Sequence, residues 1–290
     1  MLFRSMAPSY PFALAAVFGY PVMHSRSPLM HQALMAQQGI QGAYLPLEVH
    51  PDRLESALRG LEPLNFAGCN LTIPLKQKAL EIVDEVDEVA RAIGAISCVV
   101  VRADGSLFGT NNDWIGFREN LLSQWPNWTA GQGPVLVIGG GGGCRAIIYA
   151  LVQMGFTEIL LCNRTEARAH EIADRYPNLV QVIPWHARHE RLASVSLLVN
   201  TTNQGMVGEA PLDLRLDALP THARVADIIY TPLDSPLILD AAVRGHPTAN
   251  GLGMLLHQAR PAWQLWFGRD PEISAEIRAM METEIKLALG

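Results

Sequence analysis

Short apolar runs alternate with longer stretches of helical spacing along most of the chain. Runs such as "AVFGYPV" and "PVLVIGG" have the apolar, β-branched character of buried strands. The segment "SRSPLMHQALMAQQG" predicts a helix with Ser27 at the N-cap, Pro28 at the first helical position and Gly39 as its stop. This alternation predicts an α/β fold with largely parallel sheets.

Turn signals divide the pattern further. The segment "ISCVVVRADGSLFGT" predicts a hairpin around Asp104-Gly105, because apolar residues occupy both arms. Residues 123–134, "SQWPNWTAGQGP", are rich in proline, glycine and polar residues and precede a new strand. A chain of 290 residues is long enough for two domains at about 150 residues each. We therefore expect a domain boundary near residues 123–134.

A lysine follows a strand-like run in the first half of the chain. The segment "GCNLTIPLKQK", residues 68–78, begins like a buried strand, meets Pro74 and then reaches Lys76. Lysines are mostly left in water, so Lys76 taken alone is a solvated residue that opens a helix. The apolar residues that follow have helix-like spacing: Leu75, Ala79, Ile82, Val83 and Val86.

Composition and charge narrow the classes of partner. The chain is 49% hydrophobic with a formal net charge of -6, and it has no basic surplus of the kind that nucleic acid or an anionic membrane requires. Its longest apolar stretches are short and interrupted, so no transmembrane span is expected. The N-terminal segment lacks a convincing signal-cleavage site and suggests a ragged start, with translation beginning at Met1 or Met6, and then a first strand.

The four cysteines are scattered singly along the chain. They have none of the CxxC spacing that metal and redox sites use, so buried, reduced thiols are expected and no metal site. With the acidic composition, this usage predicts a soluble, cytoplasmic protein. The residues are Cys69, Cys98, Cys144 and Cys162.

A run of glycines carries the sharpest local motif. In "PVLVIGGGGGCRAIIYALVQMG" a buried strand, residues 135–138, precedes five glycines and an amphipathic helix. Without side chains, the backbone can approach a pyrophosphate, and the helix offers its unpaired N–H groups. A flexible linker is the alternative, but the flanking strand and helix favour a dinucleotide loop. Cofactor contacts are expected from Gly139, Gly141, Gly142 and Gly143.

The residues after the next strand indicate which dinucleotide binds. About twenty residues beyond the glycines, an NAD-binding protein typically places an acid for the ribose 2′-hydroxyl. This chain has Asn163, Arg164 and Thr165 there, with Arg168 one helical turn later. Guanidinium groups suit a 2′-phosphate, so the pattern predicts NADP, and an exposed arginine pair at a helix start is the alternative.

Polar residues also interrupt the apolar segments of the first region. Each one can be explained alone as a cap or a turn. In combination, and with "LLVNTTNQGM", "DIIYTPLDSPL" and "NGLGMLLHQA" further on, they resemble the shikimate dehydrogenase family from Gly19 to Gly268, in the same order. The motifs that carry the resemblance include "HSRSP", "NLTIPLK", "GTNNDWIGF", "VIGGGGGCRA" and "NRTEAR".

The resemblance implies a role for each matching residue. Lys76 would supply or accept the proton during reduction of a ketone, and Asp113 would orient its ammonium group. For Tyr230 and Gln258 a core tyrosine and a helix-surface glutamine are the alternatives. The implied substrate-binding residues are Ser25, Ser27, Thr72, Ser97, Tyr230 and Gln258, and the further implied cofactor contacts are Asn163, Thr165, Gly251 and Met254.

Three positions depart from the family pattern. Ser97 stands in "AISC" where the family usually reads Ala-Val-Asn-Thr, so a shorter hydroxyl replaces an amide. Asn112 stands where threonine is usual, and Asn250 stands where an aspartate commonly precedes "GxGM". These departures leave Lys76 and Asp113 in place but keep quinate and aminoshikimate open as substrates.

The resemblance also implies the organisation of the molecule. It predicts an α/β substrate-binding domain from residues 1–112 plus 251–290, an NADP-binding Rossmann domain from 113–250, and a cleft between them. A helix containing Met254, Leu255 and "PAWQLWFG" would pack back on the first domain.

The implied activity is an NADP-dependent oxidoreductase that interconverts 3-dehydroshikimate and shikimate, as a monomer or homodimer without nucleic-acid or membrane partners. A catalytically silent NADP-binding sensor is the alternative from a different class.

Overall fold

The computed structural model describes residues 12–289, which form two compact units. Unit 1 takes the described residues of Met1–Asn112 together with Gln258–Met281. Unit 2 takes Asp113–His257 and the described residues of Glu282–Gly290. The ragged start and the choice between Met1 and Met6 lie outside the described residues. The expected functional domains, 1–112 plus 251–290 and 113–250, and the boundary expected near 123–134 stay predictions.

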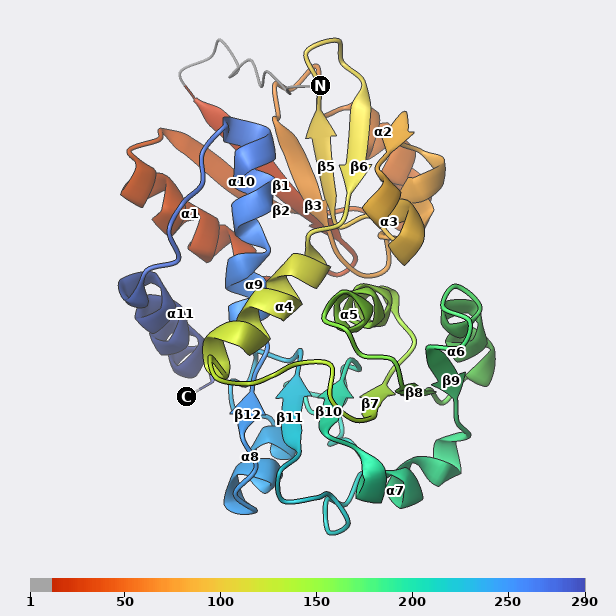
Figure 1. Ribbon diagram of the computed structural model, residues 1–290. Coiled ribbons are helices and arrows are strands. Elements are labelled where there is room, and N and C mark those ends of the chain that lie inside the picture. The colour runs from red at the N-terminus through yellow and green to blue at the C-terminus, as the bar shows by residue number, and fades with distance from the viewer. Residues whose placement is uncertain (1–11, 290) are drawn as a thin grey trace. The chain divides into compact units, whose positions relative to one another are not determined.

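Unit 1 contains a mixed six-stranded sheet in the order β2-β1-β3-β5-β6-β4 (Figure 1). Strand β1 runs parallel to β2 and β3, whereas β5 runs antiparallel to β3 and β6. The β5–β6 hairpin turns through Gly105 at a φ of 82°, which confirms the hairpin prediction. The strands are β1 (Ala13–Gly19), β2 (Gly42–Glu48), β3 (Gly68–Leu71), β4 (Glu85–Val86), β5 (Cys98–Val101) and β6 (Leu107–Thr110).

Helix α1 begins one residue earlier than the sequence predicts. Its N-cap is Arg26, and Ser27 is the first helical residue. The predicted N-cap at Ser27 is therefore wrong, because the hydroxyl of Ser25 accepts the Ser27 N–H at 3.3 Å instead. Gly39 ends the helix in the left-handed conformation, as predicted. The helices of unit 1 are α1 (Ser27–Gln38), α2 (Leu54–Arg59), α3 (Glu88–Ile93) and α10 (Ala259–Phe267), and α11 (Ala275–Leu287) contributes its first turns.

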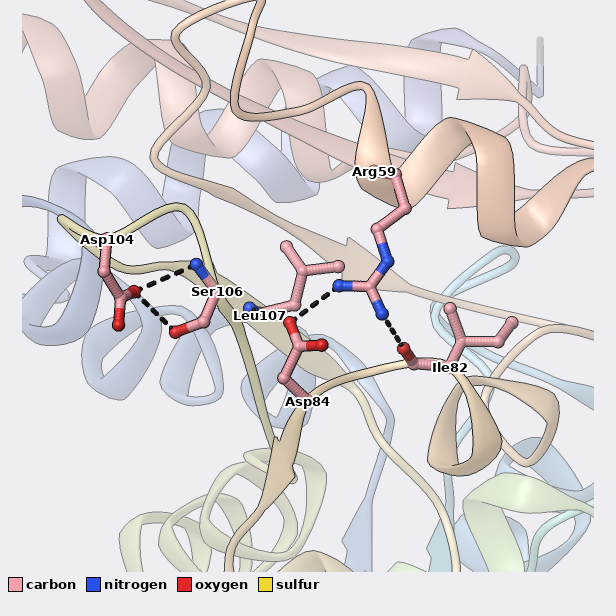
Figure 2. A network of polar contacts seen from close by, with 6 residues as sticks. All are labelled: Arg59, Ile82, Asp84, Asp104, Ser106 and Leu107. Atoms are coloured by element: carbon pink, nitrogen blue, oxygen red, sulfur yellow. Dashed lines mark hydrogen bonds and ion pairs between the residues drawn. The ribbon is translucent and has the colours of Figure 1, made fainter.

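The helix-like spacing after Lys76 does not produce an α-helix. That segment forms a 3₁₀ turn, Lys78–Glu81, and then strand β4, which pairs with β6. Figure 2 shows the contacts that hold it: the carboxylate of Asp84 accepts bonds from Arg59 (2.6 Å) and from the Leu107 amide (2.7 Å). The Arg59 bond and the Leu107 amide lower the pKa of Asp84. Pairing with β6 thus overrides the helix-like spacing of the apolar residues. That spacing reflects the burial of one side of the segment.

The sheet of unit 1 has aromatic residues at its contact with α10. Figure 1 shows α1 and α10 at one side of this sheet and α2 and α3 at the other. Trp266 donates its indole N–H to the Val99 carbonyl at 3.0 Å, and Trp263 donates to His31 Nδ1 at 2.8 Å. The His31 ring stacks on Tyr44 with centroids 3.9 Å apart. Burial lowers the pKa of His31 to about 3, so this imidazole is neutral.

Unit 2 contains a parallel six-stranded sheet in the order β12-β11-β10-β7-β8-β9. The chain runs outward from β7 to β9 and then returns to β10 beside β7. This is the strand order of the Rossmann fold, with its topological switch point between β7 and β10. The strands are β7 (Val135–Ile138), β8 (Ile159–Cys162), β9 (Val180–Val182), β10 (Leu197–Asn200), β11 (Arg224–Asp227) and β12 (Thr248–Ala249).

Two apolar clusters sandwich this parallel sheet. Side chains of α4, α5 and α6 belong to one cluster, and side chains of α8 and the loops before β11 belong to the other. The four-residue apolar strands are buried along their whole length, as expected for a sheet covered on both faces. The helices are α4 (Asp113–Gln124), α5 (Gly142–Gln153), α6 (Glu166–Ala173), α7 (Arg188–Arg191), α8 (Pro236–Val243) and α9 (Leu252–His257).

The single helix predicted from Met254 through "PAWQLWFG" is wrong. The segment forms α9 and α10, which are separated at Gln258. Pro261 has no N–H to offer the carbonyl of His257, so a continuous helix would lose a bond at this point. Met254 packs against the core of unit 2, whereas α10 belongs to unit 1.

The cysteines are buried free thiols, as predicted. Burial raises the pKa of Cys144 to about 12 and that of Cys162 to about 11, so both stay protonated near neutral pH. Within residues 12–289, no helix is long and apolar enough to cross a membrane. Over the same residues, no three histidine, cysteine or acidic side chains are grouped so that they could hold a metal ion.

Candidate active site

Polar residues collect at one edge of the unit 1 sheet. Strands β3 and β6 end at this edge and β5 begins there, because β5 is antiparallel to both. The Leu71 amide donates to the Ser97 carbonyl (2.9 Å), and the Ser97 amide donates to the Thr110 carbonyl (3.0 Å). The edge therefore holds Asn70 at the end of β3, Ser97 just before β5, and Asn112 just after β6.

Asn70 is held in one orientation by two bonds. Its side-chain oxygen accepts a bond from the Tyr44 hydroxyl at 2.7 Å, and its side-chain nitrogen donates to the Ser97 carbonyl at 3.1 Å. All three residues are buried. Asn70 thus links β2, β3 and the residue that precedes β5, a connection between strands that the local sequence does not indicate.

Lys76 lies half-buried beside this edge. The Ile96 amide donates to the Lys76 carbonyl at 2.8 Å, which fixes the lysine backbone next to the residue preceding Ser97. The Thr72 amide donates to the Phe18 carbonyl at 2.9 Å, so the end of β1 joins the same edge. The structure thus brings together the backbones of Thr72, Lys76 and Ser97.

Three further predicted substrate-binding residues belong to unit 1. Ser25 lies in the loop that leaves this edge after β1, and its amide donates to the Val22 carbonyl at 2.9 Å. Ser27 is buried and Ser25 is half-buried. Gln258 is only 8% exposed, so the alternative of a helix-surface glutamine is wrong.

Two predicted site residues belong to unit 2. Asp113 is the first residue of α4 and is 6% exposed. Tyr230 is half-buried and follows β11. Lys76 belongs to unit 1, so its pairing with Asp113 stays a prediction.

The glycine loop after β7 has the form of a phosphate cradle. A Cβ at Gly139 would lie 2.2 Å from the Thr201 hydroxyl oxygen, and a Cβ at Gly140 would lie 2.8 Å from the Asn163 side-chain nitrogen. Gly141 is exposed and has open space where a Cβ would point. Helix α5 starts at Gly142 without a side-chain cap, so its first N–H groups can bind a phosphate.

The arginine motif lies next to this loop. A Cβ at Gly140 would also lie 3.3 Å from the Cβ of Arg168. Asn163 donates its side-chain N–H to the Thr165 carbonyl at 2.8 Å and so shapes the turn into α6. Arg164 and Arg168 are exposed at the start of that helix. These residues fit NADP, with the diphosphate on the glycines and the 2′-phosphate near the guanidinium groups.

Gly251 has a packing role in the structure. A Cβ there would lie 2.0 Å from the Ile228 carbonyl oxygen, and the Gly251 amide donates to the Ile229 carbonyl at 2.8 Å. Only a glycine permits this approach between the start of α9 and the end of β11. Contacts of Gly251 and Met254 with the cofactor stay predictions.

A buried carboxylate at the end of β11, Asp227, is not among the residues predicted from the sequence. Asp227 accepts bonds from Ser235 Oγ (2.6 Å), from the Ile229 amide (3.0 Å) and from Asn200 Nδ2 (3.1 Å). Burial raises its pKa to about 6, against the opposing effect of these bonds. The network fixes the loop that carries Tyr230. The available signal was a pair of neighbouring apolar strands, "LLVN" and "RVAD", that both end in a polar residue.

Three known protein families match successive parts of the chain. Residues 17–99 match the shikimate dehydrogenase substrate binding domain, and residues 126–208 match the shikimate / quinate 5-dehydrogenase family. Residues 251–281 match the shikimate 5'-dehydrogenase C-terminal domain.

Individual relatives match over almost their whole length. Shikimate dehydrogenase (NADP(+)) of Paramagnetospirillum magneticum is 48% identical over 268 residues, which cover 92% of this chain and 97% of the relative. The crystal structure of shikimate 5-dehydrogenase from Thermus thermophilus in complex with NADP(H) and shikimate is 33% identical, with a TM-score of 0.82 over 95% of this chain and 99% of that one. Quinate dehydrogenase from Corynebacterium glutamicum in complex with NAD is 29% identical, with a TM-score of 0.85 over 95% and 99%. This chain belongs to the shikimate dehydrogenase family.

Proposed function

We propose that this protein is an NADP-dependent dehydrogenase that interconverts 3-dehydroshikimate and shikimate. The observation that carries the proposal is the 48% identity with a shikimate dehydrogenase (NADP(+)) across 92% of the chain. The polar edge of unit 1 and the glycine cradle of unit 2 support it, because they supply the two kinds of surface that such a reaction needs. Unit 1 would bind the acid and unit 2 the cofactor.

Substrate recognition is assigned to hydroxyl and amide side chains. Ser25 and Ser27 would bind the carboxylate at the start of α1, and Thr72 and Ser97 would bind ring hydroxyls at the strand edge. Tyr230 and Gln258 would complete the site. Neutral donors of this kind suit a small polyhydroxylated acid, because each can bond a hydroxyl without adding charge.

The proton step is assigned to Lys76 and Asp113. When bound, NADP accepts or supplies the hydride on the reacting carbon. Lys76 would move the matching proton at the reacting oxygen through its ammonium group. Asp113 would balance the charge of that group and hold it at hydrogen-bond distance from the oxygen, roughly 2.6–3.2 Å.

Cofactor binding is assigned to the loop after β7 and to the start of α6. Gly139, Gly141, Gly142 and Gly143 would let the diphosphate approach the N-terminus of α5. Arg164 and Arg168 would pair with the 2′-phosphate, whose extra charge separates NADP from NAD.

Quinate is the second candidate substrate. A quinate dehydrogenase shares the fold with a TM-score of 0.85, and Ser97 replaces the amide expected at its position. Aminoshikimate is the third candidate, for the same reason at Ser97. The cytoplasmic location and the monomer or homodimer state stay predictions.

The test is NADP reduction with shikimate, quinate and aminoshikimate measured side by side on the purified protein. We expect the highest kcat/KM with shikimate. A higher value with quinate or aminoshikimate would assign the chain to that substrate instead. NADP binding without turnover of any of the three acids would favour the catalytically silent sensor.

A further inference from the structure

Asn112 has a buried donor that meets no acceptor in the part of the chain that the structure describes. The residue is 3% exposed, and its side-chain nitrogen has no hydrogen-bond partner among residues 12–289. Two other asparagines at this edge are satisfied: Asn70 donates to the Ser97 carbonyl, and Asn111 donates to the Ala95 carbonyl at 2.8 Å. An amide N–H that is buried without a partner costs free energy unless a ligand or water supplies an acceptor.

The backbone of Asn112 is fixed by Ser97. The Ser97 hydroxyl oxygen accepts the Asn112 backbone N–H at 2.8 Å. Ser97 is itself held by its bonds to Leu71, Asn70 and Thr110, and it is 2% exposed. The short serine side chain thus anchors the residue that carries the unpaired amide. A hydrogen-bond donor whose orientation is fixed by packing and by the hydrogen bonds of its neighbours gives selective ligand binding.

We propose that the Asn112 side-chain amide is a specificity-determining donor that binds a neutral hydroxyl oxygen of the cyclic hydroxy acid. The assignment rests on the proposed function and deepens it. A neutral oxygen is favoured over a carboxylate, because the buried side chain of Asp113 follows directly in the chain. A site with an unpaired donor rejects an analogue that lacks the matching oxygen.

The assignment also relates two departures noted in the sequence. Position 97 has a hydroxyl where an amide is expected, and position 112 has an amide where a hydroxyl is expected. The amide thus stands at the second residue after β6 in place of the residue before β5, and the Ser97 hydroxyl holds the backbone of Asn112. Exchange of the two side chains is therefore the direct test of this arrangement.

The first experiment uses Asn112→Ala and measures both stability and kinetics. Without ligand, its Tm should equal or exceed that of the wild type, because the lost donor was unpaired. The rise in Tm on adding shikimate should shrink, and the KM for shikimate should increase roughly tenfold, the usual cost of one bond to a buried polar group. The Kd for NADP, measured by titration without shikimate, should stay unchanged.

Asn111→Ala is the matched control. It removes the neighbouring amide, which already has a partner, so its Tm without ligand should fall. A lower Tm for Asn112→Ala as well, with an unchanged KM for shikimate, would overturn the proposal and leave Asn112 a structural residue.

The second experiment exchanges the side chains with Ser97→Asn, Asn112→Thr and the double variant. Each single variant should raise the KM for shikimate, and the double variant should recover most of the loss, because one amide again faces the ligand. Simple addition of the two losses would overturn the proposal. If the wild type neither turns over nor is stabilised by shikimate, quinate or aminoshikimate, the proposed function itself fails, and the assignment of Asn112 fails with it.

Discussion

Arg164 lies exposed where the glycine loop meets the start of α6, and Arg168 follows one turn later. If the guanidinium of Arg164 pairs with the 2′-phosphate, Arg164→Ala should raise the KM for NADP about ten- to hundredfold, since a hydrogen bond to a charged group contributes about 1.5–3 kcal/mol. The KM for NAD, which lacks this phosphate, should change little. Steady-state kinetics with both cofactors measure the difference. Arg191→Ala, at another exposed arginine of unit 2, is the control, and equal weakening of both cofactors by Arg164→Ala would contradict the assignment.

The titration of the Asp227 carboxyl group makes the free energy of unfolding depend on pH. Its pKa rises from an ordinary value of 3.8 to about 6, so the folded protein holds this proton more tightly than the unfolded chain does. Its contribution to the free energy of unfolding therefore decreases as pH rises from about 4 to 6, by roughly 3 kcal/mol in total. Asp227→Asn removes the titration, so its stability relative to the wild type should increase across this range.

Denaturant unfolding of both proteins at pH 4, 5, 6 and 7 provides the measurement for Asp227. The pH dependence of the difference is the relevant quantity, because any constant effect of the substitution cancels. Asp174→Asn, at an exposed carboxylate of the same unit, is the control. A difference that stays flat from pH 4 to 7 would show that Asp227 titrates in its ordinary range.

The β7–α5 connection is the element on which cofactor binding depends. Gly141 has φ −90° and ψ −174°, an extended conformation that alanine also adopts. Apart from its two chain neighbours, no described residue has an atom within 4 Å of the Cβ position. Gly141→Ala should therefore fold with an unchanged Tm. The new methyl group would occupy space that the diphosphate needs, so the Kd for NADP should increase roughly tenfold or more.

Fluorescence titration and thermal unfolding of the same Gly141→Ala sample separate the two effects. Gly139 is the contrasting position, because its φ of 130° and the nearby Thr201 hydroxyl make alanine there destabilising. Unaltered NADP affinity in a well-folded Gly141→Ala protein would place the diphosphate elsewhere.

Local signals were sufficient to predict most elements. The strand before the glycines, the β5–β6 hairpin and the left-handed stop at Gly39 are each determined by residues adjacent in sequence. The segment after Lys76 departs from its helix-like spacing because it ends in a strand that pairs with β6, with Glu85 opposite Phe108. The break at Gln258 departs from the predicted single helix because Pro261, three residues on, cannot donate a backbone hydrogen bond.

The candidate site was predictable only in part, for a related reason. The resemblance to the shikimate dehydrogenase family implies Lys76 and Asp113, and the glycine run between a strand and a helix by itself predicts a dinucleotide loop. The orphaned amide of Asn112 and the orientation of Asn70 depend on partners from other strands, such as Tyr44 and Ser97. Burial and pairing of this kind cannot be predicted from spacing along one chain.

At the scale of the whole molecule, unit 1 is completed by a distant part of the chain. Trp263 and Trp266 on α10 bond His31 and Val99, which are 232 and 167 residues away in sequence. Most of the proposed acid-binding residues belong to unit 1, and the proposed cofactor-binding glycines and arginines belong to unit 2. The proposed catalytic pair takes one residue from each unit. The central claim is that Lys76 and Asp113 act as this pair.

The most direct measurement of that claim is the turnover of Lys76→Met with shikimate and NADP. Methionine keeps the aliphatic length and removes the ammonium group, so we expect unchanged Tm and NADP affinity and a kcat lower by about 10²–10⁴-fold. Asp113→Asn should also impair turnover, and the double variant should lose much less than the product of the two single effects, because the pair acts as a unit. Turnover of Lys76→Met close to that of the wild type would contradict the account and return Lys76 to the role of a solvated surface residue.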